Sequence, residues 1–271
     1  MNIPFTKMHG LGNDFVIVDR RSSENKINLL NIPHLGDRRR GIGFDQFLML
    51  FPPKNGGDVF MQITNPDGSE AEACGNGTRC VADLLMSKSD VNNINIETVA
   101  GTLSCWRTHD NAVVVNMGNV KTHWQEIPLS EATDTLNVKL NGAPFNNCTC
   151  VNIGNPHAVF FCANVDEIPL KEVGPILENH KIFPQRANIE FATVRSKQEI
   201  RMRVWERGAG ITEACGSGAC AVLVAAVRNE LTARRADVIL DGGCLNIEWA
   251  ADDTILMTGP TAISFYGEIT V

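Results

Sequence analysis

The chain has 271 residues, 44% of them hydrophobic and 20% charged, which is enough for two modest globular domains with separate cores. A net charge of −7 and a pI near 5.4 exclude the basic footprint of a nucleic-acid-binding protein. No apolar run reaches the ~18 residues of a membrane span, and the N-terminus lacks the pattern of a signal peptide. The nine cysteines form no disulfide framework. We therefore expect a cytoplasmic protein with no nucleic-acid or membrane partner.

Apolar runs bounded by turn residues predict strands in both halves of the chain. These runs are residues 15–19, 47–51, 59–64, 94–99 and 112–117, then 158–162, 189–194, 200–205, 237–241 and 254–259. Helices are predicted at 80–88, 170–180 and 219–231. The last of these is apolar nearly all round, so it must be buried on every side. This predicts a helix wrapped by a curved sheet.

Polar landmarks recur in the same order in the two halves. At an offset of 141 residues, Asn65 falls on Glu206, Glu72 on Glu213 and Cys74 on Cys215. At an offset of 142, Gly12-Asn13-Asp14 falls on Gly154-Asn155-Pro156, and Gln46 falls on Asn188. The sequence between these landmarks differs. The pattern favours an ancient duplication that kept a site, and the alternative is a chance alignment of common Gly and Asn residues.

The strongest repeat is Glu-Ala-Cys-Gly-x-Gly, which places Cys74 and Cys215 just before a predicted helix. The first N–H groups of a helix have no intrahelical partner, and the helix dipole adds positive charge there, so such an end suits a carboxylate. The glycines allow close approach of a ligand to the backbone. A thiol at this position is expected to shift toward thiolate, with a pKa of ~3.5–7.5.

If the two halves face each other, one carboxylate could lie between the two helix ends with a sulfur on each side. This arrangement would move a proton at the carbon α to that carboxylate. One thiolate would remove the proton from one face, and the opposing thiol would deliver another to the other face. Backbone donors would stabilise the charge that develops on the carboxylate. A symmetric pair suits a reversible reaction, because acid and base exchange roles in reverse.

Other interpretations of the cysteines remain open at this point. Cys74 and Cys215 could form a structural disulfide, or one of them could be the nucleophile of a thiol hydrolase, although neither explains the duplicated motif. A zinc site is disfavoured because the chain has no C-x-x-C pair. No dinucleotide or phosphate loop supports a cofactor, since residues 41–46 lack a third glycine. The remaining cysteines are expected to be mostly small buried hydrophobes: Cys80, Cys105, Cys148, Cys150, Cys162, Cys220 and Cys244.

Several motifs together resemble the diaminopimelate epimerase family. They are HGLGNDF (9–15), GIGFDQ (41–46), NPDGSEAEACGNGTRC (65–80), GNPH (154–157) and WERGAGITEACGSGACA (205–221), and the resemblance continues to SFYGEI (264–269). It implies an α/β (α+β) fold of two pseudo-symmetric domains, each a mixed, mostly antiparallel β-barrel around a central helix. The domains would be residues 1–118, joined by the returning strand 262–271, and residues 119–261. The function implied is a pyridoxal-independent isomerase that interconverts LL-2,6- and meso-diaminopimelate for lysine and peptidoglycan synthesis, as a cytoplasmic homodimer without a cofactor.

The resemblance also assigns roles to individual residues. Cys74 and Cys215 would be the acid–base pair, with Cys215 the base in the LL direction. Gly75, Asn76, Gly216 and Ser217 would bind the reacting carboxylate, Glu206 the α-ammonium group, and Asn65, Asn155, Asn188 and Arg207 the distal end of the substrate. Asn13 and Gln46 would complete the substrate contacts, His157 and Glu206 would tune the thiol pKa values, and Tyr266 would contact the second subunit.

The residues alone leave simpler roles open. Asn13 and Asn155 sit beside glycine and could only form turns. His157 could be a structural histidine, Arg207 a surface ion pair, and Tyr266 a half-buried strand residue.

Three other functions compete with the epimerase. A proline or hydroxyproline racemase would use two thiols, but its substrate has no distal carboxylate for Asn188 and Arg207 to hold. A phenazine-biosynthesis-like isomerase would not be expected to keep both cysteines. A redox-sensing or amino-acid-binding protein would bind a dicarboxylic amino acid without exchanging its protons.

Overall fold

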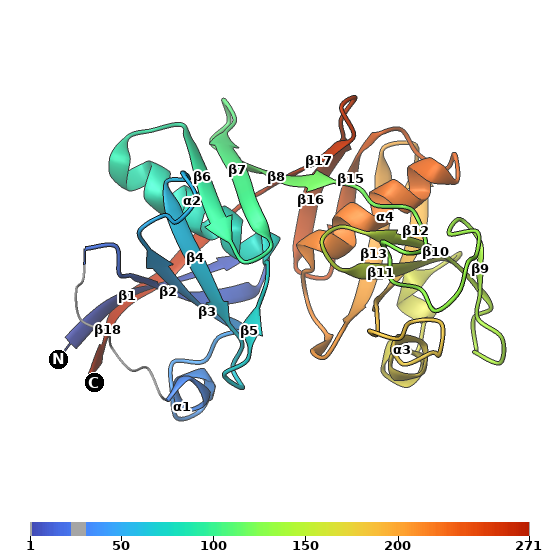
Figure 1. Cartoon of the computed structure of the whole chain (residues 1–271), viewed down its shortest axis with the longest axis horizontal. Coiled ribbons are helices and arrows are strands. Elements are labelled where there is room, and N and C mark those ends of the chain that lie inside the picture. The colour runs from blue at the N-terminus through green and yellow to red at the C-terminus, as the bar shows by residue number, and fades with distance from the viewer. Residues whose placement is uncertain (1, 23–30, 271) are drawn as a thin grey trace. The chain divides into compact units, whose positions relative to one another are not determined.

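The computed structural model describes residues 2–22 and 31–270. The chain divides into two compact units (Figure 1). Unit 1 comprises Met1–Val115 and Gly259–Val271, and unit 2 comprises Asn116–Thr258. The chain thus leaves unit 1, completes unit 2 and returns with its last strand. Among the helices that the described residues form, none is long and apolar enough to cross a membrane.

The sheet of unit 1 has the strand order β18–β1–β2–β3–β4–β6–β7–β8, and the short β5 lies beside β4. The pairs β2–β3 and β4–β6 are parallel and the others are antiparallel. The strands are β1 (Asn2–Gly10), β2 (Asn13–Asp19), β3 (Gln46–Phe51), β4 (Val59–Thr64), β5 (Glu70–Ala71), β6 (Asn93–Thr98), β7 (Gly101–Arg107), β8 (Val113–Asn119) and β18 (Ala262–Thr270). The helices are α1 (Ile32–Gly36) and α2 (Gly75–Ser89).

Unit 2 has the strand order β9–β10–β11–β12–β13–β15–β16–β17, with the short β14 beside β13. Here β11–β12 and β13–β15 are the parallel pairs. The strands are β9 (Val138–Lys139), β10 (Asn147–Asn152), β11 (Pro156–Phe161), β12 (Asn188–Ser196), β13 (Glu199–Glu206), β14 (Gly210–Ile211), β15 (Arg235–Leu240), β16 (Gly243–Trp249) and β17 (Thr254–Gly259). The helices are α3 (Leu170–Glu178), α4 (Gly216–Arg228) and the short 3₁₀ helix Val165–Glu167.

The two units repeat one topology. Strands β1 to β8 correspond in order to β10 to β17, the parallel pairs fall at the same places, and α2 and α4 occupy the same position in the sequence of elements. The register repeats as well, because Phe15 lies opposite Gln46 in β2–β3 and His157 lies opposite Asn188 in β11–β12. Both pairs are related by the 142-residue offset. The predicted fold class, two pseudo-symmetric α+β domains, is confirmed.

A buried helix forms the centre of each unit. In α2 every residue from Gly75 to Met86 is buried except Asp83, and in α4 every residue from Gly216 to Ala226 is buried except Ser217. The first helix packs against β1, β2, β6 and β7, and the second packs against strands from β10 to β16. Each sheet therefore curves around its helix, as the apolar pattern of residues 219–231 predicted.

Both central helices begin directly after the cysteines, at Gly75 and Gly216, as the placement of Cys74 and Cys215 before a helix predicted, whereas the runs 80–88 and 219–231 cover only the later turns. The first turns contain Gly-Asn-Gly and Gly-Ser-Gly, which are poor helix formers, so local propensity argued against them. Tertiary packing overrides that propensity. Strands β1, β7, β10 and β16 were missed for a different reason, because polar or small residues interrupt their apolar residues.

Helix α3 packs tightly on β13. A Cβ atom added to Gly174 would lie only 2.5 Å from Cδ2 of the Trp205 ring. From the end of the same helix, Glu178 accepts a hydrogen bond of 2.7 Å from Trp205 Nε1. This contact fixes the end of β13, where Glu206 and Arg207 follow.

We predict that Gly174→Ala lowers the free energy of unfolding by about 1–3 kcal/mol through overpacking, even though alanine is the better helix former. Urea unfolding measures the change. The control is Lys171→Ala on the exposed face of the same helix, which should stay within about 0.5 kcal/mol of the unaltered protein. Equal stability of Gly174→Ala and the unaltered protein would refute the tight contact.

Candidate active site

Each predicted cysteine is the N-cap residue of a central helix. The sulfur of Cys74 accepts a hydrogen bond from the Gly77 N–H over 3.3 Å, and the sulfur of Cys215 accepts one from Gly218 N–H over the same distance. Both residues have extended backbone conformations. A side-chain acceptor at this position satisfies one of the free donors of the first turn. The sulfurs therefore sit at the positive end of each helix dipole.

The second glycine of each motif is needed for space around the sulfur. A Cβ atom on Gly77 would approach Leu48 Cδ1 to 3.1 Å and Cys74 Sγ to 3.4 Å. A Cβ atom on Gly218 would approach Glu190 Oε1 to 3.0 Å and Cys215 Sγ to 3.2 Å. The second glycine of Gly-x-Gly thus allows the first turn of each helix to pack against the cysteine sulfur that caps it.

The surroundings of Cys215 contradict the predicted shift toward thiolate. Burial raises the pKa of this thiol well above its ordinary value, and the negative charges of Glu206 and Glu190 raise it further. Hydrogen bonds with Ser217 and the Gly218 N–H oppose the rise. The helix end alone predicted the opposite direction, because the sequence did not show that two carboxylates lie next to the sulfur.

Glu206 lies at the end of β13 and hydrogen bonds with the Cys215 thiol. Burial raises the pKa of Glu206, whereas hydrogen bonds with Thr212 and Cys215 lower it. The Thr212 hydroxyl donates to Glu206 Oε1 over 2.6 Å. Glu206 is thus in contact with a thiol, as its predicted role in tuning a thiol pKa requires.

In unit 1, a chain of amide hydrogen bonds leads from the helix to the β1–β2 turn. Asn76 Nδ2 donates to Asn13 Oδ1 over 3.2 Å, and Asn13 Nδ2 donates to Asp45 Oδ2 over 2.8 Å. The buried Arg79 donates to Asn76 Oδ1 over 3.0 Å. These contacts fix two of the predicted substrate-binding asparagines in defined orientations.

Asp45 and Asp14 are held by two cations. Arg38 reaches both carboxylates, at 2.7 Å and 2.6 Å, and Lys7 Nζ lies 2.6 Å from Asp14 Oδ2. Although burial opposes it, hydrogen bonds from Arg38 and Lys7 lower the pKa of Asp14 to about 2. Asp14 therefore stays ionised at neutral pH, and Asp45 anchors Asn13. Arg38 itself is exposed, and no sequence motif marks it as a partner of these carboxylates.

Gln46 and Asn65 also meet in unit 1. Gln46 Nε2 donates to Asn65 Oδ1 over 3.2 Å, from adjacent antiparallel strands. Asn65 Nδ2 donates to Ser69 in the following turn. Unit 1 therefore brings together one group of the predicted residues: Asn13, Gln46, Asn65, Cys74, Gly75 and Asn76.

In unit 2, His157 lies fully buried between two partners. Its Nδ1 is 2.7 Å from Glu190 Oε1, and its Nε2 is 2.7 Å from Asn155 Oδ1. The hydrogen bonds of His157 therefore go to a carboxylate and an amide rather than to a thiol. Although burial raises the pKa values of Glu190 and Glu206, their interactions with His157 lower them, and both carboxylates raise the pKa of Cys215.

The predicted distal binding residues form a separate set of contacts in unit 2. Asn188 Nδ2 donates to the Pro156 carbonyl over 3.0 Å, and Asn188 Oδ1 accepts from the Arg207 N–H over 3.0 Å. The Arg207 guanidinium donates to the Gln185 carbonyl. Glu178 holds the same loop by accepting from the Gly208 N–H over 3.0 Å.

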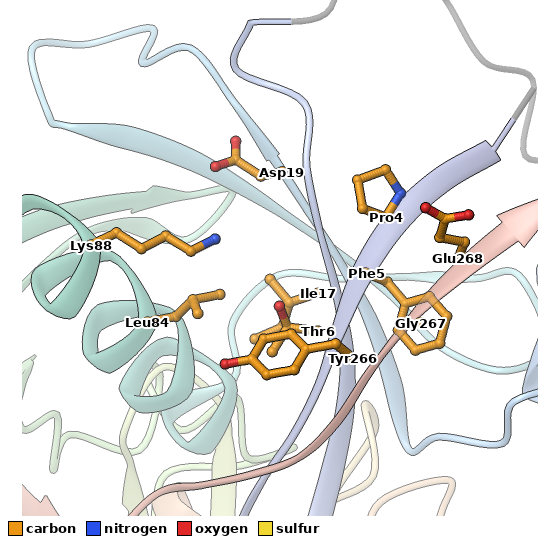
Figure 2. A pocket seen from close by; sticks show the side chains of 10 residues that line it. All are labelled: Pro4, Phe5, Thr6, Ile17, Asp19, Leu84, Lys88, Tyr266, Gly267 and Glu268. Carbon is orange, nitrogen blue, oxygen red and sulfur yellow. The ribbon is translucent and has the colours of Figure 1, made fainter.

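Tyr266 lies apart from both groups, on the outer face of unit 1. It is 68% exposed on β18, where Ile263 and Phe265 are also exposed. Its ring borders a pocket of about 430 Å³ formed by β1, β2, α2 and β18 (Figure 2). Neither cysteine lines this pocket, so it is not the chemical site.

The nine cysteines, which all lie within residues 31–270, are free thiols. Five of the seven others are buried as predicted: Cys80, Cys105, Cys148, Cys150 and Cys220. Cys162 is half-buried and Cys244 is exposed. The described residues include no cluster of three or more His, Cys, Asp or Glu side chains that could hold a metal ion.

Comparison with known proteins identifies the family. The sequence model of diaminopimelate epimerase matches residues 5–123 and 149–263. A diaminopimelate epimerase of Rhodospirillum centenum is 51% identical over 266 residues, covering 98% of this chain and 91% of that protein. The diaminopimelate epimerase of Acidiphilium cryptum is 46% identical, covering 98% and 96%.

The chain belongs to the diaminopimelate epimerase family. The protein is therefore an isomerase, and the family resemblance found in the sequence is confirmed.

Solved structures of low sequence identity share the fold. A hydroxyproline epimerase from Agrobacterium vitis superposes with a TM-score of 0.71 at 13% identity, covering 99% of this chain and 92% of the other. A phenazine biosynthesis protein of the PhzF family from Bacillus anthracis superposes with a TM-score of 0.70 at 13% identity, covering both chains completely. At this identity the likeness concerns the fold alone.

We predict that Glu206→Gln lowers the pKa of the Cys215 thiol, because it removes a negative charge that disfavours the thiolate. Cys215 should then react faster with iodoacetamide at a given pH. The measurement is the pH dependence of alkylation at Cys215, followed by mass spectrometry of its peptide. Glu172→Gln, on the exposed surface of α3, serves as the control and should leave the profile unchanged. A profile that is unchanged or shifted to higher pH in Glu206→Gln would contradict the assignment.

Proposed function

We propose that the protein interconverts LL- and meso-diaminopimelate by a two-base thiol mechanism without a cofactor. The observation that carries this proposal is the repeated cysteine cap, in which two units of one topology each place a free thiol at the N-terminus of a buried helix. The relatives named diaminopimelate epimerase support the choice of substrate. The reaction belongs to the supply of lysine and peptidoglycan precursors.

In the LL direction, the Cys215 thiolate would take the proton from the substrate α-carbon, and the Cys74 thiol would give its proton to the opposite face. One S–H bond forms and one breaks, so the number of protons is unchanged. The configuration inverts because the proton leaves from one face of the α-carbon and the new proton arrives at the other. In the reverse direction the roles exchange. Burial and the two carboxylates raise the pKa of Cys215 and so disfavour its thiolate in the free protein, whereas the thiolate, once formed, is the stronger acceptor of a weakly acidic carbon proton.

The reacting carboxylate would be held by the first turns of α2 and α4. Gly75 and Gly216 are the first helical residues, and Asn76 and Ser217 follow them. Their N–H groups belong to the part of a helix that lacks intrahelical acceptors. They would stabilise the negative charge that moves onto the carboxylate oxygens when the α-proton leaves.

The remaining polar residues would orient the substrate. Glu206 would bind the α-ammonium group next to Cys215. Arg207, with its guanidinium fork, would bind the distal carboxylate. The amides expected to complete the distal and central contacts are those of Asn13, Gln46, Asn65, Asn155 and Asn188.

We also propose that the two units act as the N-terminal and C-terminal domains that enclose the substrate, and that the enzyme is a cytoplasmic homodimer. Nine free thiols suit a reducing compartment. For the dimer, the outermost strand β18 of the unit 1 sheet exposes Ile263, Phe265 and Tyr266. An edge strand with exposed apolar side chains is a surface that a second chain can cover.

The decisive test is proton NMR of LL-diaminopimelate with reduced protein in D2O. The α-proton signal should disappear as the meso isomer grows. Cys74→Ala and Cys215→Ala should each lower the rate of epimerisation at least about a hundredfold, because each removes one proton-transfer group. Cys244→Ala, which removes an exposed cysteine, is the matched control.

Each other outcome of this test points elsewhere. Full activity of either cysteine variant under reducing conditions would refute the two-base mechanism. Binding without exchange would indicate a binding or redox protein. Absence of both, with exchange of proline protons, would indicate a racemase of the proline type.

We predict that Tyr266→Ala shifts the protein from dimer to monomer at micromolar concentration, since it removes a large exposed aromatic side chain from the proposed interface. Analytical ultracentrifugation measures the change. Ile176→Ala removes an exposed apolar side chain from α3 in unit 2 and should not alter the mass. An unchanged dimer in Tyr266→Ala would place the interface elsewhere.

A further inference from the structure

The two half-sites differ in one pair of buried residues. With the 142-residue offset, His157 corresponds to Phe15 and Glu190 corresponds to Leu48. All four side chains are fully buried. In unit 1 a Cβ atom on Gly77 would meet Phe15 and Leu48, and in unit 2 one on Gly218 would meet Glu190. An apolar pair has thus been replaced by a histidine and a carboxylate beside one thiol only.

Burying two charged groups costs free energy unless close contact and further hydrogen bonds offset the loss of their hydration. Glu190 Oε1 contacts His157 Nδ1, while Glu190 Oε2 has no hydrogen-bond partner among the described residues. The charged and titratable groups that act on this carboxylate or are acted on by it are His157 on β11, Glu206 on β13, Cys148 on β10 and Cys215 at α4. Burial raises the pKa of Glu190, and the contact with His157 lowers it. His157 is the one member of this set whose charged form is positive, so Glu190 depends on His157 for its compensation.

The other nitrogen of His157 reaches a residue of the proposed substrate site. Nε2 lies 2.7 Å from Asn155 Oδ1, so both ring nitrogens face oxygen acceptors. Two acceptors require two N–H donors, which a histidine has when it is doubly protonated. The carboxylate of Glu190 supplies the negative charge that stabilises this form.

The protonation of His157 determines the orientation of the Asn155 side-chain amide. With a protonated Nε2, His157 donates to Asn155 Oδ1, and the NH2 group is then the end of the amide that does not contact His157. The equivalent Asn13 is held in the opposite sense, with its NH2 group on Asp45 and its oxygen on Asn76. If His157 lost its Nε2 proton, the Asn155 amide would turn to donate to it and would present an oxygen instead.

We propose that Glu190 is a positioning residue that acts through His157 to keep the Asn155 amide turned with its NH2 group toward the distal carboxylate of the substrate. The use of Asn155 by a dicarboxylic amino acid rests on the function proposed above. Glu190 itself does not contact the substrate. Its carboxylate stabilises the doubly protonated form of His157. His157 in turn sets the orientation of the Asn155 amide, whose NH2 group favours a negatively charged group of the substrate over a positively charged one.

The first measurement is nitrogen-15 NMR of the histidine rings in the free protein, with His157 assigned by triple-resonance spectra. Both ring nitrogens of His157 should be protonated at neutral pH. In Glu190→Gln, which keeps the shape but removes the charge, one of the two nitrogens should lose its proton. This measurement uses no substrate, so its result does not depend on whether the proposed reaction is correct.

The second measurement is the steady-state kinetics of LL-diaminopimelate epimerisation. Glu190→Gln should raise KM about tenfold, because it disturbs a contact to the unreacting end of the substrate. It should also change kcat, because the Glu190 charge raises the pKa of the Cys215 thiol, so the rise in KM is the readout for the amide. Glu97→Gln is the matched control. Glu97 is likewise buried, at 1% exposed, and it accepts hydrogen bonds from the backbone N–H groups of Lys54, Asn55 and Gly57.

The inference is overturned if Nε2 of His157 is unprotonated in the unaltered protein, or if Glu190→Gln leaves both the ring protonation and KM unchanged. It is also overturned if Glu97→Gln reproduces the rise in KM, because the effect would then follow from the loss of any buried carboxylate. Should Glu190→Gln fail to fold, the spectrum of the unaltered protein still decides the protonation. Loss of activity in Cys74→Ala is unrelated to these outcomes and tests only the proposed reaction.

Discussion

The hydrogen bond from a helix N–H group to a cysteine sulfur is the contact on which the rest of the site depends. It places Cys74 and Cys215 at the ends of the two buried helices and requires a glycine three residues later. The helices in turn need sheets that curve around them, because they are buried on all sides. The fold of each unit therefore positions a sulfur and the N–H groups of a first helical turn in one place.

The two units differ in the polar and charged residues that surround the capped helix end. Unit 1 surrounds its helix end with neutral amides that are anchored by the carboxylates Asp14 and Asp45. Unit 2 places carboxylates directly beside its thiol, at Glu206 and Glu190. A duplicated backbone thus gives two thiols with the same capping geometry and different charged neighbours. Such a difference suits an enzyme whose substrate isomers are not mirror images of each other.

The sequence predicted the repeated topology, the buried helices and the cysteine motif, because apolar runs and duplicated landmarks are local patterns. It did not predict the direction of the Cys215 pKa, because Glu190 lies 25 positions earlier in the chain and becomes a neighbour only when α4 packs against β12. Arg38 and Glu178 were missed as supports of the site for the same reason. Their partners lie in other elements, and no motif marks them.

The return of the last strand to unit 1 has a consequence for the order in which the protein matures. Strand β1, formed from the first ten residues, lies between β2 and β18, and β18 consists of residues 262–270. During synthesis, unit 2 has all its residues before unit 1 does. Until residues 262–270 have been synthesised, one edge of β1 in unit 1 therefore has no partner strand. Unit 2, although it is synthesised later than most of unit 1, is the first unit that can complete its fold.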